Sequence, residues 1–167
     1  MKLAKDRYSV RQFTDEVIDE DTINKITAAV KFAPTACNRQ PVKILVVNSE
    51  EGIEKLKKCT ECHYNARNAM IICCDKAESW KRKYDGKSSG DIDGSIVTTY
   101  LMLTAASLGV GTTWIMYFIP EAVKEEFSLQ DNLEPVAILV MGYPAKDSKP
   151  ASGHFEFKAV EEMVSYK

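Results

Sequence analysis

Several features that would assign the chain to a common class are scarce or missing. No run of 18 or more apolar residues is present, so we expect no membrane-spanning helix. The formal net charge of -2 gives no general attraction to nucleic acid or to an anionic membrane, and we expect neither as a partner. The N-terminal residues 1–6 lack the apolar run of a signal peptide, and five cysteines make an odd number. We therefore expect a cytoplasmic protein with reduced thiols.

Histidine is also scarce, since only His63 and His154 are present. This scarcity limits schemes that use a protein nucleophile and a histidine base, and no Ser-His-Asp set is evident. The remaining composition is ordinary for a globular protein, with 45% hydrophobic and 28% charged residues in 167. The length predicts one domain, residues 1–167.

Apolar periodicity and capping residues predict irregularly alternating helices and strands, which indicate a layered α/β domain. The expected helices are Asp19–Ala33, Glu50–Lys58, Asp91–Leu108 and Glu121–Phe127. Their boundaries rest on Asp19 or Asp21 and Ser49 as N-caps, Pro34 as a stop, Gly109 as a C-cap glycine and Pro120 at a first turn. The expected strands are Val42–Val47, Met70–Cys74, Thr112–Met116 and Pro135–Met141.

Burial is predicted for some of these segments. The strands 42–47, 70–74 and 135–141 are apolar enough to lie in the core. The long helix is expected to bury one face, with further contacts from its neighbours; these residues are Ile92, Ile96, Tyr100, Leu103, Ser107, Leu101, Ala105 and Leu108. Residues 75–90 are expected to form a loop anchored by Trp80 and Tyr84. The tail from Ala145 is expected to lie on a part that is already folded.

The segment 7–13 has a pattern that suits phosphate binding. In an extended chain Arg7, Ser9 and Arg11 point to one side, and Tyr8 and Val10 to the other. Two guanidinium groups beside a hydroxyl match the charge and the acceptor oxygens of a phosphate. A solvated polar face is the simpler alternative and stays open on this pattern alone.

The segment 33–41 contains two prolines that restrict its backbone. In an extended path Asn38 and Gln40 point the same way, and their amides match the carbonyls and N–H group of a flavin pyrimidine edge. The alternative is a loop whose amides satisfy their own backbone. A third segment, 108–115, has two glycines that permit close backbone approach, but it lacks the dinucleotide-binding fingerprint.

Taken together, these segments resemble the FMN-dependent nitroreductase family. The similar motifs are Arg-x-Ser-x-Arg-x-Phe at 7–13, Ala-Pro-Thr-Ala-Cys-Asn-x-Gln-Pro at 33–41, the helix 93–106 with Leu-Gly-Val-Gly-Thr-Thr-Trp-Ile at 108–115, and Val-Ala-Ile-Leu-Val-Met-Gly-Tyr-Pro at 136–144. They occur in the family's order and spacing over nearly the whole chain. The resemblance implies an α+β fold, a three-layer α/β/α sandwich with a mostly antiparallel central sheet, in a homodimer with FMN at the subunit interface.

The resemblance also implies roles for individual residues. The FMN phosphate and ribityl chain are expected at Arg7, Ser9 and Arg11. The loop that reaches the flavin from the partner subunit corresponds to Pro34, Thr35, Ala36 and Asn38, with Gln40 near the ring. The stretch beside flavin N5 corresponds to Trp114, Ile115, Met116 and Tyr117, the last two through their backbone.

One departure from the family pattern concerns the phosphate. Phe157 stands where a basic residue, often arginine, is usual near the C-terminus, with Lys158 beside it and His154 upstream. Lys158 is the expected substitute, although the lysine ammonium is a point charge, whereas the planar arginine guanidinium can bind a phosphate through two N–H groups. Asp93, at the start of the long helix, is expected to have a structural role.

The chemistry implied by the resemblance belongs to the flavin, so no catalytic side chain and no metal is expected. NADH or NADPH passes a hydride to N5, and a nitroaromatic, a quinone or a similar small acceptor then takes the electrons in a ping-pong cycle. Alternatives with the same fold are an FMN carrier or sensor, a specialised flavin enzyme such as a reductive dehalogenase or one that breaks down flavin, and an interaction protein with a degenerate site.

A different class of function is suggested by Cys59, Cys62 and His63, which form a Cys-x-x-Cys-His pattern. Covalent haem attachment requires export, for which no signal is present. Together with Cys73 and Cys74, the cluster is a candidate for soft-metal or redox-thiol chemistry. The simpler alternative is ordinary packing of small apolar thiols.

Overall fold

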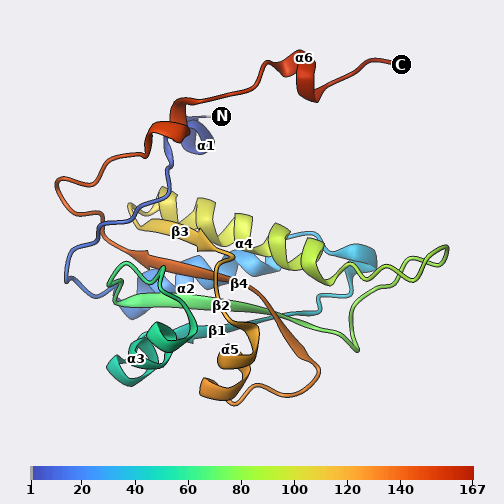
Figure 1. Ribbon diagram of the computed structural model, residues 1–167, viewed down its shortest axis with the longest axis horizontal. Coiled ribbons are helices and arrows are strands. Elements are labelled where there is room, and N and C mark those ends of the chain that lie inside the picture. Colours follow the sequence, from blue (N-terminus) through green and yellow to red (C-terminus); the bar gives the residue numbers. More distant parts are fainter. Residues whose placement is uncertain (1) are drawn as a thin grey trace.

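The computed structural model describes residues 2–167 as a four-stranded antiparallel sheet with helices on both faces (Figure 1). The strands are β1 (Val42–Val47), β2 (Asn68–Asp75), β3 (Gly111–Ile115) and β4 (Leu133–Gly142), in the order β1-β2-β4-β3. The α-helices are α1 (Lys2–Asp6), α2 (Glu20–Ala28), α3 (Glu50–Cys59), α4 (Gly90–Ser107), α5 (Pro120–Glu126) and α6 (Val160–Met163). Short 3-10 helices are η1 (Ala29–Phe32), η2 (Ala36–Asn38) and η3 (Ser152–Phe155).

The central strands β2 and β4 divide their side chains between two cores, because successive residues of a strand point to opposite faces. Met70 and Ile72 face α2 and α4, whereas Ile71 and Cys73 face α3 and α5. All eight residues of β2 are buried, so this strand is covered on both sides. The α+β fold with three layers and an antiparallel sheet is therefore confirmed.

The predicted caps explain where the helices begin and end. The Asp19 carboxylate accepts a hydrogen bond from the Thr22 amide at 2.9 Å, and the Ser49 hydroxyl accepts one from Gly52 at 3.1 Å. Pro120 occupies the first turn of α5. Gly109 follows α4 with φ of 77°, the left-handed conformation that a C-terminal glycine supplies.

The predicted helix 19–33 is shorter in its α-helical part than expected. It forms α2 as far as Ala28, and the remaining residues to Phe32 tighten into the 3-10 helix η1. Ala33 is extended, with ψ of 123°, as the residue before a proline should be. The short helix α1 was not predicted.

Strand β1 is not the buried strand that its composition predicts. It lies at the edge of the sheet, where Lys43 is exposed and only Val47 of its six residues is fully buried. The strand pairs with β2 alone, in a register that places Val42 opposite Cys74. Apolar composition indicates that the faces of a strand pack against other elements. It does not predict whether both edges of the strand are hydrogen-bonded to neighbouring strands.

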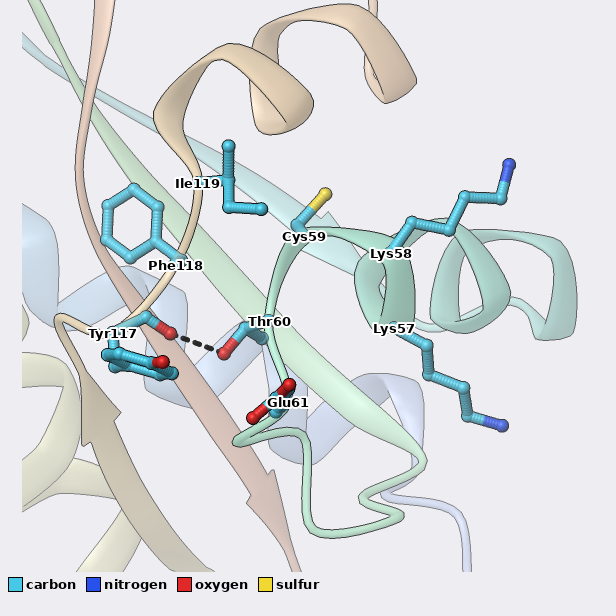
Figure 2. Close-up of a pocket in the computed structure, with 8 residues that line it drawn as sticks. All are labelled: Lys57, Lys58, Cys59, Thr60, Glu61, Tyr117, Phe118 and Ile119. Atoms are coloured by element: carbon cyan, nitrogen blue, oxygen red, sulfur yellow. Dashed lines mark hydrogen bonds between the residues drawn. The ribbon is translucent and has the colours of Figure 1, made fainter.

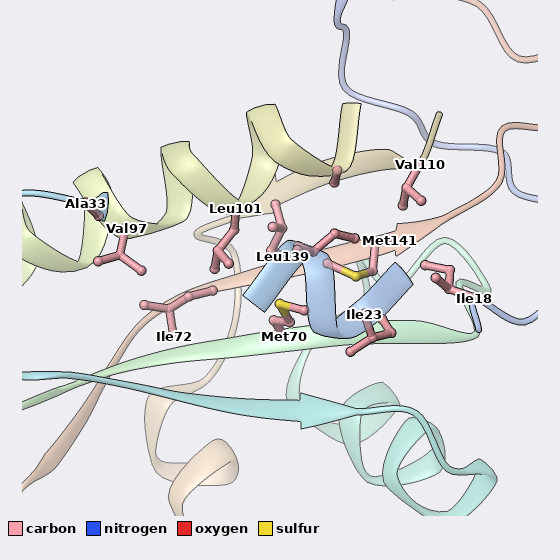
Figure 3. Packing of buried hydrophobic residues seen from close by; sticks show 12 residues of the cluster. Ile18, Ile23, Ala33, Met70, Ile72, Val97, Leu101, Val110, Leu139 and Met141 are labelled. Atoms are coloured by element: carbon pink, nitrogen blue, oxygen red, sulfur yellow. The ribbon is translucent and has the colours of Figure 1, made fainter. Parts of the chain in front are cut away.

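Helix α4 buries only part of the surface that was predicted for it. Val97, Leu101 and Ala105 point to the sheet, and Figure 3 shows the first two directed at β2 and β4. By contrast, Ile92 is 54% exposed and Tyr100 37% exposed. The predicted burial of Leu101 and Ala105 is confirmed, whereas that of Ile92 and Tyr100 was wrong, because the helix is apolar on all sides and its sequence does not select one face.

The segment between β2 and α4 extends away from the body of the protein (Figure 1). It is held by a bridge between Lys81 and Ser88 and by an ion pair between Arg82 and Asp85. Tyr84 is 94% exposed, so the prediction that it anchors this segment was wrong.

The C-terminal tail departs from expectation as well. Residues 155–167 are exposed throughout, and α6 lies well away from the sheet (Figure 1). Residues 155–167 therefore do not lie on the folded body, whereas the earlier part of the tail does, since the Ala145 amide donates to the Gln12 carbonyl and the Tyr8 hydroxyl to the Ser148 carbonyl. Among residues 2–167, no helix combines the length and the apolar character that crossing a membrane requires.

Candidate functional site

The segment that carries Arg7, Ser9 and Arg11 runs beside the first residues of β3. Ser9 forms a parallel bridge with Thr112, whose carbonyl oxygen accepts a hydrogen bond from the Val10 amide at 3.0 Å. Val10 is 2% exposed and packs against the backbone of Gly111, where a Cβ atom would lie 2.7 Å from the valine. The segment is thus extended where it bridges β3, with Val10 turned into the core.

Both arginines keep their charge available. The Arg7 guanidinium donates to the Met102 sulfur at 3.0 Å, a weak acceptor, and Arg11 donates to the Ser9 carbonyl at 3.2 Å. Neither forms an ion pair with a carboxylate anywhere in residues 2–167. Two uncompensated guanidinium groups on one short segment can bind an anion with several oxygen atoms.

The loop between Pro34 and Gln40 is compact and strained, not extended as predicted. Cys37, Asn38 and Gln40 all have φ near 50°, in the left-handed region that costs a non-glycine residue of the order of 1–3 kcal/mol. Thr35 closes the loop, because its hydroxyl accepts from the Gln40 amide at 3.0 Å and its carbonyl from the Asn38 amide at 2.9 Å. Such strain is typical of ligand-binding loops.

The side-chain amides of this loop meet despite the different backbone path. The Gln40 amide nitrogen donates to the Asn38 side-chain oxygen at 3.0 Å, and both residues are exposed. One donor of Gln40 and one acceptor of Asn38 are used in this contact, which leaves further donors and acceptors free. The turn η2 thus brings the two side-chain amides together, and their expected match to a flavin edge stays a prediction.

Asp93 joins this loop to the beginning of α4. Its carboxylate is 1% exposed and accepts hydrogen bonds from the Ala36 amide at 2.9 Å and from the Ser89 hydroxyl at 2.7 Å. A carboxylate near the N-terminus of a helix is also favoured by the helix dipole. The structural role expected for Asp93 is confirmed by these contacts.

The end of β3 presents backbone to solvent. Trp114 is half-buried and Ile115 is 4% exposed, whereas Met116 is 66% and Tyr117 71% exposed. The Phe118 amide donates to the Met116 carbonyl at 3.1 Å and closes a tight turn. Because the C=O and N–H of a trans peptide point in opposite directions, the Tyr117 N–H points away from this turn. Within residues 2–167 that N–H donates no hydrogen bond.

A cavity of about 440 Å³ lies beside the turn, between it and the end of α3 (Figure 2). Its walls are formed by Lys57, Lys58, Cys59, Thr60, Glu61, Tyr117, Phe118 and Ile119. The Thr60 hydroxyl donates to the Tyr117 carbonyl at 2.5 Å across this junction. Thr60 is a residue that the sequence did not single out, although it lies inside the Cys-x-x-Cys-His pattern.

Lys158 is not brought to the two arginines. The tail contacts the N-terminal segment earlier, where the Tyr8 hydroxyl lies 3.1 Å from the Ser148 hydroxyl and the Tyr8 ring 6.4 Å from that of His154. Lys158 follows in the exposed part of the tail, and its side chain has no ion pair or hydrogen bond within residues 2–167. Its expected role at the phosphate stays a prediction.

The cysteine cluster has the character of packing residues. Burial raises the pKa of the Cys59 and Cys73 thiols to about 11, so both stay protonated at neutral pH and are poor ligands or nucleophiles. The described part of the chain holds no group of three or more His, Cys, Asp or Glu side chains placed to bind a metal. The raised pKa disfavours thiolate chemistry at Cys59 and Cys73.

Comparison with known proteins places the chain in a family. The model of the nitroreductase family matches residues 4–71 and 65–143, which together span most of the sequence. The chain belongs to the nitroreductase family. The structure of a nitroreductase family protein from Clostridium difficile 630 is similar over 99% of this chain and 96% of that one, with a TM-score of 0.93 and 42% identity.

Other relatives in the nitroreductase family agree over most of their length. A protein of Archaeoglobus fulgidus, named provisionally as an NADH dehydrogenase/NAD(P)H nitroreductase, is 31% identical over 156 residues, covering 89% of this chain and 87% of its own. The fold is also that of an FMN-dependent nitroreductase from another Clostridium difficile strain, with a TM-score of 0.80, 24% identity and coverage of 98% and 96%.

Proposed function

We propose that this nitroreductase-family protein is an FMN-dependent NAD(P)H oxidoreductase that reduces nitroaromatics, quinones or similar small acceptors. The observation that carries the proposal is the arrangement along β3. Two unpaired arginines lie beside its first residues, and an unused backbone N–H lies just past its end. Thr112 and Met116 are four residues apart, about 13 Å along a strand. This spacing suits an elongated ligand with a phosphate at one end and a flat ring at the other.

The phosphate end of the site fits the residues present. Arg7 and Arg11 offer charged N–H donors, and Ser9, which bridges Thr112, lies between them in the chain. Hydrogen bonds to a phosphate from charged donors are roughly twice as strong as neutral ones. A dianionic phosphate would also supply the negative charge that neither arginine finds within residues 2–167.

The ring end fits as well. The Tyr117 N–H is free to donate to a ring nitrogen, and the amides of Asn38 and Gln40 can pair with carbonyls and an N–H group on a pyrimidine edge. FMN, when bound, supplies the hydride-accepting ring, and the protein supplies binding, orientation and electrostatics. The exposed Met116 and Tyr117 leave space for a second flat molecule to reach that ring.

The unpartnered outer face of α4 supports a homodimer. A helix that is apolar on all sides is normally buried on all sides, yet Ile92 and Tyr100 face solvent here. Phe32 nearby is 76% exposed. The tail adds further apolar side chains with nothing of their own chain to cover them, namely Phe155, Phe157, Val160, Met163 and Tyr166. A second copy would bury these surfaces together.

The same dimer would complete the cofactor site. Arg7 contacts Met102 near one end of α4, whereas the loop 34–40 is tied to Asp93 near the other end. Nine residues separate these two positions, about 14 Å along the helix. A two-fold axis across α4 runs the two helices in opposite directions, so the loop of one chain approaches the arginines of the other.

The names of relatives support the choice of electron donor and cofactor. The Archaeoglobus fulgidus protein is named for NADH and NAD(P)H, and a Staphylococcus aureus relative, 25% identical over 90% of this chain, is called an NADPH-dependent oxidoreductase. One structural neighbour is named as FMN-dependent. For this chain the coarser conclusion, an oxidoreductase, follows from the family, and FMN with NADH or NADPH is our proposal.

The proposal is tested by the visible absorption spectrum of the purified protein before and after anaerobic addition of NADH or NADPH. A flavin spectrum that bleaches, and that returns when a nitroaromatic or quinone is added, supports an oxidoreductase that turns over. A flavin spectrum that does not bleach favours a carrier, a sensor or an enzyme with another donor. A protein that excess FMN cannot reconstitute overturns the proposal. Sedimentation at several concentrations tests the homodimer independently.

A further inference from the structure

Thr60 occupies the junction between α3 and the turn at the end of β3. It is the first extended residue after α3, with φ of -154° and ψ of 142°, and its amide still donates to the Leu56 carbonyl at 3.2 Å. The residue is 5% exposed. Its backbone is therefore fixed by the helix, and its side chain is directed into the junction (Figure 2).

The hydroxyl of Thr60 is used both as a donor and as an acceptor. It donates to the Tyr117 carbonyl at 2.5 Å and accepts from the Cys62 amide at 3.0 Å. A second bond runs parallel to the first, from the Ile119 amide to the Cys59 carbonyl at 2.9 Å. The turn 116–118 is thus tied to the end of α3 at two points. Only one of these ties, the one through Thr60, depends on a side chain.

These ties determine where the unused Tyr117 N–H points. The Tyr117 side chain is 71% exposed and contributes little packing that would hold the residue in place. The Phe118 amide fixes the peptide before Tyr117, and the Thr60 hydroxyl fixes the carbonyl after it. With one of the two lost, rotation of the neighbouring peptides would redirect the N–H group.

We infer that Thr60 is a positioning residue for the flavin, holding the Tyr117 amide in the direction that allows it to donate to N5. This inference rests on the proposed function, since it assumes that the ring lies at this turn. It also assigns a role to the Cys-x-x-Cys-His segment, whose Cys59 carbonyl and Cys62 amide take part in the hydrogen bonds that tie the turn to the end of α3. We call this set of hydrogen bonds the brace. Thr60 does not itself touch the ring and acts through the backbone of Tyr117.

The brace is tested first without the cofactor, by hydrogen exchange of the FMN-free protein. Thr60→Val keeps the shape and removes the hydroxyl with its bonds to the Tyr117 carbonyl and the Cys62 amide. Protection of the amides at 118 and 119 should fall about tenfold, the size expected for loss of the one bond that reaches this turn. Thr60→Ser retains the hydroxyl and should restore the protection of these amides. The matched control is Thr27→Val, which removes a hydroxyl bonded to Ile23 at 3.1 Å in α2 and should leave the turn unchanged.

The flavin is tested next, by its midpoint potential and its rate of anaerobic reduction in the FMN-loaded proteins. An N–H donor stabilises oxidised N5, which accepts a hydrogen bond, more than reduced N5, which carries a proton. Thr60→Val should therefore raise the midpoint potential and change the reduction rate, with a matching loss of affinity for oxidised FMN and little change in affinity for reduced FMN. Thr60→Ser should restore all of these values.

The outcomes separate this inference from the proposed function. Loss of protection together with a shifted potential supports the positioning role. Unchanged protection overturns the brace, and lost protection with an unchanged potential overturns the link to N5, while flavin binding and turnover stand in both cases. Absence of FMN binding by the unaltered protein removes the proposed function and this role together.

Discussion

Replacement of both Arg7 and Arg11 by alanine separates cofactor binding from folding. Neither guanidinium has a carboxylate partner within residues 2–167, and their only hydrogen bonds go to the Met102 sulfur and to the neighbouring Ser9 carbonyl. Val10 between them keeps its place against β3, because its contacts are made by its own backbone and apolar side chain. The variant should therefore fold and keep its oligomeric state.

The expected loss of FMN affinity follows from the number of charged donors removed. A hydrogen bond to a charged group contributes about 1.5–3 kcal/mol, so two such contacts contribute about 3–6 kcal/mol if each arginine makes one. At about 1.4 kcal/mol per tenfold change, the Kd for FMN should rise by roughly 10²- to 10⁴-fold. Since arginine can bind phosphate through two N–H groups, the larger value is the better guide.

The assay is titration of FMN-free protein with FMN, followed by quenching of flavin fluorescence. The control is the double variant Arg67→Ala and Arg82→Ala, which removes two surface arginines paired with Asp15 and Asp85 and should leave the Kd unchanged. Circular dichroism and sedimentation establish that both variants are folded. Retention of FMN by a folded Arg7 and Arg11 double variant would refute the assignment of the phosphate to this segment.

Three further predictions concern the core, the thiols and the response to acid. Leu101→Ala should lower the free energy of unfolding by about 2–5 kcal/mol in urea denaturation, because the side chain is fully buried and leaves a cavity; a loss below 1 kcal/mol would contradict its place in the core. At pH 8 iodoacetamide should modify the exposed Cys37 and spare Cys73, whose pKa burial raises to about 11, and peptide mass spectrometry would reveal equal labelling if this is wrong. The hydrogen bond from Lys124 lowers the pKa of Glu134 in the folded protein. The stability that this bond contributes is therefore present above the pKa of Glu134 in the unfolded chain, and it is lost as the pH falls through the pKa of Glu134 in the folded protein. Glu134→Gln should reduce the loss of stability measured between pH 6 and pH 3, and an unaltered pH profile would rule this contribution out.

Helices and their boundaries follow from the sequence wherever a local interaction decides them. Ser49 caps α3 through the Gly52 amide, and Gly109 ends α4 because its backbone adopts a positive φ. The strands β2 and β4 were predicted by their apolar runs, which are typical of strands covered on both faces. The alternation at 7–13 also predicted an extended segment, which the bridge from Ser9 to Thr112 confirms at that point.

Only the tertiary structure decided how the elements face one another. Helix α4 is apolar on all sides, so packing against the sheet, and not periodicity, selected Val97 for the core and left Tyr100 outside. Strand β1 is as apolar as a central strand, and only the pairing order placed it at the edge. In both cases composition reports how much surface is apolar, but not which neighbour covers it.

The candidate site shows the same division. The residue types at 7–13 predicted an anion site, and those at 33–41 predicted amides that pair with the pyrimidine edge of a flavin. Both predictions depend on functional groups that can be read directly from the sequence. The pairing of Gln40 with Asn38 depends on left-handed backbone that the sequence does not reveal. The bond from Thr60 to Tyr117 joins positions 57 residues apart, a contact that no local pattern can encode and that exists only once α3 and β3 have packed together.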